Sequence, residues 1–263
     1  MADSVARFLG FADTYDRARP KPPVELVDLL TQWCGVAEPD VIDIGAGTGL
    51  STMVWEGRAQ HVLAVEPSKD MRAVAKARFA ALPEKHVFCA IDATAQATGL
   101  PDECVDLVTA SQAMHWFDPA TVLPEVARLL RPGGVFAAYD VDWPPAIDAE
   151  LDARYDEIVR RTSEFPHDAD DETPRWDKAG HLGRMIDSGL FSHAREICLH
   201  SREDGDADRL LELMRSQSGI AALLAKGHTE DELGLTELRE LAAQRMPQPA
   251  TWWWTYRIRL AVK

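Results

Sequence analysis

Short apolar runs alternate with helical patterns over residues 36–141. The apolar runs predict five buried strands, at 41–44, 61–65, 86–91, 105–110 and 135–139. Amphipathic patterns between them predict helices at 50–58, 69–80 and 118–130. Because strands that alternate with helices are joined by crossovers, they form a parallel sheet with helices on both faces. This part of the chain is therefore predicted to be an α/β, doubly wound domain.

The pattern changes after residue 141. A proline-rich turn leads into a polar helix, and further helices are predicted at 178–188, 210–225 and 230–243. Two more apolar runs, at 194–200 and 251–262, predict strands. Alternation along the last strand places Trp252, Trp254 and Tyr256 on one face and Trp253 on the other. The helices of this half are expected to cap the sheet.

The first 35 residues predict two short helices. Phe8, Phe11 and Tyr15 form an apolar stripe, and prolines at 20–23 separate it from a helical pattern at 24–34. The segment lacks a basic start followed by an apolar stretch, and no apolar run approaches the roughly 18 residues of a spanning helix. These observations predict a cytoplasmic protein.

Composition narrows the classes of partner. The 263 residues are 46% hydrophobic, which suffices for one core. A net charge of −15 opposes binding to phosphate backbones, which requires clustered Lys and Arg, so neither nucleic acid nor a membrane surface is expected as a partner. Four cysteines lack C-x-x-C spacing, so we predict no metal site and no disulfide framework.

The stretch VIDIGAGTGL, residues 41–50, predicts a ligand-binding corner. A buried strand runs directly into Gly45, Gly47 and Gly49, which allow a tight turn and a close approach of backbone to ligand. The second strand ends in Glu66, an acid placed to accept hydrogen bonds from ribose hydroxyls. The spacing differs from the dinucleotide fingerprint G-x-G-x-x-G, because position 50 is Leu.

The pattern D-x-G-x-G-x-G, which begins at Asp43, resembles the class I methyltransferases that use S-adenosylmethionine. FADTYDRARPKPP resembles the FxxxYDxxRPxYP opening of the group around trans-aconitate methyltransferase, with Pro22 in place of the second Tyr. HWFD and EVARLLRPGG resemble a later segment of the same group. The resemblance implies a Rossmann-like, seven-stranded sheet of order 3-2-1-4-5-7-6 with strand 7 antiparallel. It also implies that Tyr15 and Arg19 fold over the cofactor.

We therefore expect one domain, 1–263, with four parts. These are N-terminal lid helices (1–35), a cofactor-binding core (36–141), a helical cap (142–192), and residues 193–263, which complete the sheet.

Ligands of doubly wound sheets lie beyond the carboxyl ends of the strands, where the loops after the first four strands open. The predicted cofactor-binding residues are Tyr15, Arg19, Asp43, Gly45, Ala46, Gly47, Thr48, Gly49, Glu66, Pro67, Met71, Asp92, Ala93, Ser111, Gln112 and Trp116. Asp92 would accept from the adenine amine or, alternatively, would cap a helix that begins at Ala93.

The loop SQAMHWFD supplies the candidate catalytic group, His115. Methyl transfer is a direct displacement, so a base is needed only if the acceptor is a phenol, amine or carbon, and His115 alternatively positions the loop. Tyr15 or Trp116 would stabilise the sulfonium by a cation-π contact. The predicted walls of the substrate pocket are Trp116, Phe117, Trp143 and Trp176.

The sequence thus predicts a methyltransferase that acts on a small molecule as a monomer or homodimer. Two alternatives stay open: a non-catalytic protein that binds S-adenosylmethionine, and an NAD-dependent oxidoreductase, which the glycine spacing disfavours. The acceptor atom is not specified by the sequence.

Overall fold

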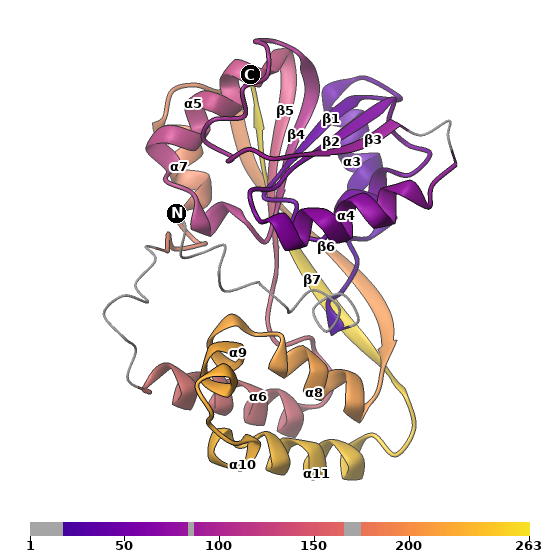
Figure 1. Cartoon of the computed structure of the whole chain (residues 1–263), viewed down its shortest axis with the longest axis vertical. Helices are drawn as coiled ribbons and strands as arrows, with labels where there is room; N and C mark the ends of the chain where they lie inside the picture. The colour runs from indigo at the N-terminus through magenta and orange to yellow at the C-terminus, as the bar shows by residue number, and fades with distance from the viewer. Residues whose placement is uncertain (1–17, 84–86, 166–174) are drawn as a thin grey trace.

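The computed structural model describes residues 18–83, 87–165 and 175–263, which form a seven-stranded sheet with helices (Figure 1). The strands are β1 (Asp40–Ile44), β2 (His61–Val65), β3 (Val87–Ile91), β4 (Val105–Ser111), β5 (Leu130–Val141), β6 (His193–Gly205) and β7 (Ala250–Val262). Their order is β3-β2-β1-β4-β5-β7-β6, and β7 is antiparallel to both neighbours. The predicted order and direction are confirmed.

Two apolar layers enclose the sheet. Val41 and Leu107 point to the face covered by α3 (Val24–Cys34), whereas Ile42 and Val108 point to the face covered by α5 (Pro119–Leu129). A third helix, α4 (Lys69–Ala80), packs beside β3. Burial on both faces explains why these strands are continuous apolar runs.

The prediction of an α-helix at 50–58 is wrong. A single 3-10 turn, η1 (Thr52–Trp55), stands there. The Thr52 hydroxyl donates to the buried Asp43 carboxylate at 2.6 Å, and Gly57 ends the segment with φ +70. Since Thr52 is held by β1 and the chain turns after Trp55, no α-helix propagates from the glycine corner.

The cap is a separate helical layer at the far end of a two-stranded ribbon (Figure 1). It consists of α6 (Ala149–Ser163), α8 (Ala207–Arg215), α9 (Ser218–Ala225), α10 (Glu230–Leu233) and α11 (Leu235–Arg245). β5 pairs with β7 only over Val135–Val141, so the remainder of β7 pairs with β6 alone and carries the cap away from the core. Most cap helices thus lie between the last two strands.

The segment expected as one cap, 142–192, divides between two places. Its first helix, α6, joins the cap, but its second, α7 (His181–Asp187), packs on β6 and β7 beside the sheet. Met185 of α7 is fully buried in the same apolar cluster as α5. The last strand alternates as predicted: Trp252 and Trp254 are fully buried, whereas Trp253 is 53% exposed.

Candidate functional site

A cavity lies at the carboxyl ends of β1, β2 and β4, where the sequence places the ligand. We call it the first pocket. Thirteen of the predicted site residues line it: Arg19, Gly45, Ala46, Gly47, Thr48, Glu66, Pro67, Met71, Ser111, Gln112, Trp116, Phe117 and Trp143. Tyr15 lies outside the described residues. The edge of the sheet therefore gathers segments from residue 19 to residue 143 around one cavity.

The three glycines of the corner have different roles. All have positive φ, between +58 and +74. A Cβ on Gly45 would lie 2.7 Å from Phe117, and one on Gly49 would lie 2.9 Å from Phe79, so these two glycines allow close packing. A Cβ on Gly47 would meet nothing within 4 Å. Gly47 is thus the glycine whose backbone faces open space at the pocket.

Glu66 is held at the end of β2 by backbone amides. Its side chain is nearly buried, and it accepts hydrogen bonds from the amides of Gly47 at 2.9 Å and Ser68 at 2.7 Å. Burial raises the pKa of this carboxyl, while the two amides and the Arg72 guanidinium oppose the shift. A carboxylate in this position has lone pairs left to accept from a diol.

Asp43 and Gly49 brace the corner and do not line the cavity. Both oxygens of Asp43 are occupied, by the hydroxyls of Thr52 at 2.6 Å and Thr109 at 2.8 Å. Burial raises the pKa of Asp43 to about 6, against the effect of these two hydrogen bonds. Asp43 thus holds β1 against η1 and β4, and its contact with a cofactor stays a prediction.

Asp92 and Ala93 also lie away from the cavity. The Asp92 side chain is 70% exposed and pairs with the Arg72 guanidinium at 2.6 Å. Arg72 donates in addition to the backbone oxygen of Glu66 at 2.7 Å. No described helix begins at Ala93, which packs against an apolar cluster. The helix-cap interpretation is therefore wrong, and the contact of Asp92 with adenine stays a prediction; its side chain ties the end of β3 to α4.

A second pocket adjoins the first and shares four of its walls, Arg19, Gln112, Trp116 and Trp143. Its other walls come from three places: His115 in η2 (Met114–Trp116), the segment 175–178, and the junction of α8 and α9 at Gln217 and Ser218. The predicted pocket residue Trp176 is part of that segment.

Cations stack on the aromatic walls of the second pocket. The Arg175 guanidinium lies 4.3 Å from the centroid of the Trp116 ring, and that of Arg19 lies 4.6 Å from the Trp143 ring. Arg19 also donates to the backbone oxygen of Ser216 at 2.7 Å. These contacts join the sheet edge to the cap.

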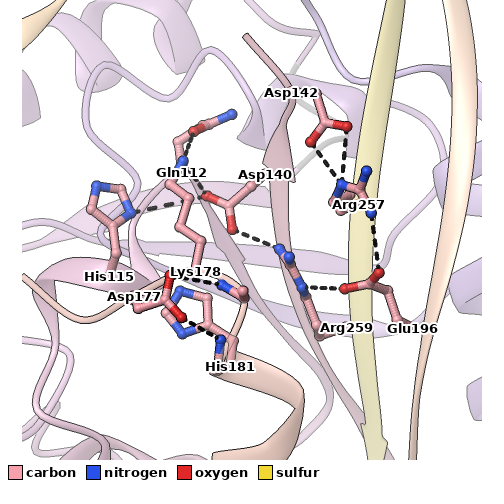
Figure 2. Close-up of polar contacts among 12 residues, drawn as sticks. Gln112, His115, Asp140, Asp142, Asp177, Lys178, His181, Glu196, Arg257 and Arg259 are labelled. Carbon is pink, nitrogen blue, oxygen red and sulfur yellow. Dashed lines mark hydrogen bonds and ion pairs between the residues drawn. The ribbon is translucent and has the colours of Figure 1, made fainter. Parts of the chain in front are cut away.

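His115 lines only the second pocket, beside a buried charge cluster (Figure 2). Its Nδ1 lies 3.9 Å from an oxygen of Asp140, which pairs with Lys178 at 2.9 Å and Arg259 at 3.0 Å. Burial lowers the pKa of His115 to about 3, and Lys178 adds to the shift while Asp140 opposes it. The ring is therefore neutral at physiological pH.

Four charged residues of this region were not predicted from the sequence: Asp140, Lys178, Arg175 and Arg259. A weak signal was available, because an acid inside one apolar strand and a base inside another often pair when buried. Gln112 adds a further feature: its φ is +51, and its side-chain oxygen accepts from Lys178 at 2.9 Å. Backbone strain of this kind concentrates at functional sites.

Residues 42–138 match the family model described as a methyltransferase domain. The matched residues run from β1 through the glycine corner and α5 into β5, and so include the walls of the first pocket on β1, β2 and β4. The core of the sheet is thus similar to methyltransferase domains. A probable S-adenosylmethionine-dependent methyltransferase of Saccharomyces cerevisiae is 29% identical over 145 residues, 51% of this chain and 46% of that relative.

Curated relatives match the chain over about half of its length or over most of it. Rv3342 of Mycobacterium tuberculosis, described as an uncharacterized methyltransferase, is 44% identical over 120 residues, which are 46% of each chain. The chain thus spans about half the length of that relative. A malonyl-[acyl-carrier protein] O-methyltransferase of Pectobacterium atrosepticum is 27% identical over 246 residues, 92% of this chain and 87% of the relative.

Solved structures share the fold over nearly the whole chain. A proposed type II methyltransferase from Anaeromyxobacter dehalogenans superposes with a TM-score of 0.65 at 24% identity, covering 93% of this chain and 97% of that one. The YcgJ protein of Bacillus subtilis gives 0.54 at 21% identity, covering 91% and 98%. The resemblance to the trans-aconitate group stays a prediction from the motifs.

The described part of the chain holds no group of three or more His, Cys, Asp or Glu side chains that could ligate a metal. Within the same residues, every helix is too short or too polar to cross a bilayer.

Proposed function

We propose that the whole chain transfers a methyl group from S-adenosylmethionine to a small molecule bound in the second pocket. The observation that carries the proposal is the pairing of Glu66 with the open backbone of Gly47 at the first pocket, next to a second pocket that shares four of its walls. Adjacent pockets with a common wall suit a reaction in which two small molecules must meet. When bound, S-adenosylmethionine supplies the methyl group.

The residues of the first pocket fit this cofactor. Glu66 would accept hydrogen bonds from both ribose hydroxyls, with its orientation already fixed by two amides. Met71 and Pro67 would provide apolar contact for the adenine, and the Trp116 face would stabilise the sulfonium. Gly47 leaves the space that a ligand needs at the corner. The cofactor role of Tyr15 stays a prediction.

The second pocket would position the acceptor. Trp116 and Trp143 line it together with Trp176, and large aromatic walls exclude water and fix the orientation of a bound molecule. Orientation of this kind can account for most of the rate of a direct displacement. The absence of nucleic-acid and membrane partners, a cytoplasmic location and a monomeric or homodimeric state stay predictions.

His115 would remain neutral while the enzyme works, because its pKa lies at about 3. A group with so low a pKa is a weak base, so we propose that it accepts a hydrogen bond and leaves proton removal to solvent. The rate constant kcat/KM should then show no limb near pH 6.5 that belongs to His115. The related O-methyltransferase makes an oxygen acceptor one class to include in assays.

The test uses the full chain with methyl-labelled S-adenosylmethionine and a fractionated cell extract. Mass spectrometry should identify a metabolite that gains the label, and calorimetry should detect binding of the cofactor. Binding without transfer to any fraction would favour the non-catalytic alternative. Binding of NAD with hydride transfer, and no binding of S-adenosylmethionine, would favour the oxidoreductase and overturn the proposal.

A further inference from the structure

A buried carboxylate, Asp140, lies near the end of β5 within a chain of alternating charges (Figure 2). It is 4% exposed, and its two oxygens pair with Lys178 at 2.9 Å and Arg259 at 3.0 Å. Arg259, itself buried, is bound on its other side by Glu196 at 2.8 Å. Since buried charges are stable only when they are paired, this network holds the Asp140 carboxylate in one place.

His115 approaches the same carboxylate from the loop after β4. Its Nδ1 is buried, has no hydrogen-bond partner among the described residues, and lies 3.9 Å from the nearer oxygen of Asp140. This distance exceeds that of a hydrogen bond, but catalytic hydrogen bonds often shorten when substrate binds. The other ring nitrogen points away from Asp140 (Figure 2), and the ring lines the second pocket.

We infer that Asp140 is a positioning residue for His115. A carboxylate accepts hydrogen bonds and does not donate them, so it favours the tautomer that carries hydrogen on Nδ1. The lone pair of Nε2 then faces the second pocket. The inference extends the proposed function, and only its statement about the acceptor rests on that function.

The charges around His115 explain why Asp140 can orient the ring without causing its protonation. Lys178 and Arg175 lie on the segment before α7, His181 lies on α7, and Asp140 lies on β5. Burial and the cations lower the pKa of His115, and Asp140 alone among these groups raises it. Lys178 pairs with Asp140 and also with Gln112, so it offsets the carboxylate that orients the ring.

This arrangement specifies a chemical property of the acceptor. A neutral imidazole with its lone pair toward the pocket accepts a hydrogen bond from an O–H or N–H group. An acceptor with no such group would cover the ring and leave Nε2 without a hydrogen-bond partner. We therefore expect the labelled metabolite to carry a hydroxyl or an N–H near the atom that is methylated.

The experiment measures the imidazole nitrogens of the full chain, labelled with ¹⁵N, by long-range ¹H–¹⁵N correlation between pH 4 and 9. The expected result is a His115 signal of the Nδ1–H tautomer that shows no midpoint of titration within this range. In Lys178→Met, removal of the like charge should raise the pKa of His115, so that its signal titrates at the acid end of the range. Lys178→Arg should restore the wild-type behaviour.

Arg160→Met is the control for loss of a cation. Arg160 lies on α6, pairs with Glu164 at 2.8 Å and is not among the groups that shift the pKa of His115, so its loss should leave the His115 signal unchanged. Asp140→Asn should abolish the preference for Nδ1–H; if this buried substitution prevents folding, the Lys178 variants decide the result.

An Nε2–H tautomer in the wild-type protein, or an unchanged His115 titration in Lys178→Met, would overturn the inference. A labelled acceptor without any O–H or N–H would overturn its statement about the acceptor. None of the nitrogen measurements needs the cofactor, so their outcome is independent of whether the chain binds S-adenosylmethionine.

Discussion

The two pockets are built in opposite ways. In the first, the polar group Glu66 is placed by main-chain features that are near one another in sequence, because three glycines and two amides set it beside the open backbone of Gly47. The second is assembled from side chains that come from five distant parts of the chain, and buried charges tie one of these parts, through Lys178, to the sheet. The first pocket should therefore fail when the backbone is altered, and the second when a single charge or ring is removed.

Gly47→Val should produce the largest effect. A β-branched side chain at φ +58 strains the corner by about 1 to 2 kcal/mol and fills the space left for the cofactor, so binding of S-adenosylmethionine should become undetectable by calorimetry. Circular dichroism should show a folded protein, because nothing packed surrounds the new Cβ. Gly133→Val, at φ +79 with equally open surroundings, is the matched control and should bind normally. Normal binding by a folded Gly47→Val would remove the cofactor from this corner.

Glu66→Ala should weaken cofactor binding by about 2 to 4 kcal/mol, since charged hydrogen bonds contribute about 1.5 to 3 kcal/mol each and water replaces them in part. Asp92→Ala is the control: Asp92 ends the neighbouring strand but is 70% exposed and paired with Arg72, so the change should be within about 0.5 kcal/mol. Equal losses in the two variants would support the predicted contact of Asp92 with adenine.

Trp116→Ala tests the wall that the pockets share. If the ring stabilises the sulfonium, the affinity for S-adenosylmethionine should fall by about 0.5 to 2 kcal/mol more than that for the neutral product S-adenosylhomocysteine. Trp116→Phe should retain part of this difference. Trp253→Ala, whose ring is 53% exposed on the opposite face of β7, should change neither affinity. Equal losses for both ligands would reduce Trp116 to an apolar wall.

The stability of the chain in acid should report on the second pocket. Burial lowers the pKa of His115 to about 3 and that of His181 to about 4, whereas an unfolded histidine titrates near 6.5. Between about pH 6.5 and 4, the unfolded chain binds protons that the folded chain does not. Each histidine therefore lowers the free energy of unfolding by about 1.4 kcal/mol per unit of acidification.

Asp43 acts in the opposite direction below about pH 6, because its raised pKa makes the folded form take up the proton. The readout is thus a comparison of variants by urea denaturation. Between pH 6.5 and 4, His115→Gln should reduce the pH dependence of the free energy of unfolding by about 1.4 kcal/mol per pH unit, which is the contribution of one histidine. Parallel curves for wild type and variant would show that His115 is not neutral in the folded protein.

Much of the first pocket was predictable. The glycine corner and Glu66 are defined by residues near one another in sequence, and the carboxyl ends of parallel strands necessarily meet at one edge. The directions of side chains were not predictable. Asp92 ends its strand as predicted and its side chain pairs with Arg72, and the buried Asp43 accepts hydrogen bonds from two hydroxyls. A sequence places a residue at a strand end without specifying which neighbour its side chain will contact.

By itself, the sequence determined the order of strands and helices, the turn that a run of glycines permits, and the face of β7 that carries Trp252 and Trp254, because periodicity and backbone freedom are local properties. Only the tertiary structure decided that α7 returns to the sheet while α6 joins the cap. It alone brought Lys178 and Arg259 to Asp140, and it alone buried His115, which is the main reason that the pKa of this ring is low. Burial and the pairing of distant charges depend on which segments meet in space, and no local pattern encodes that.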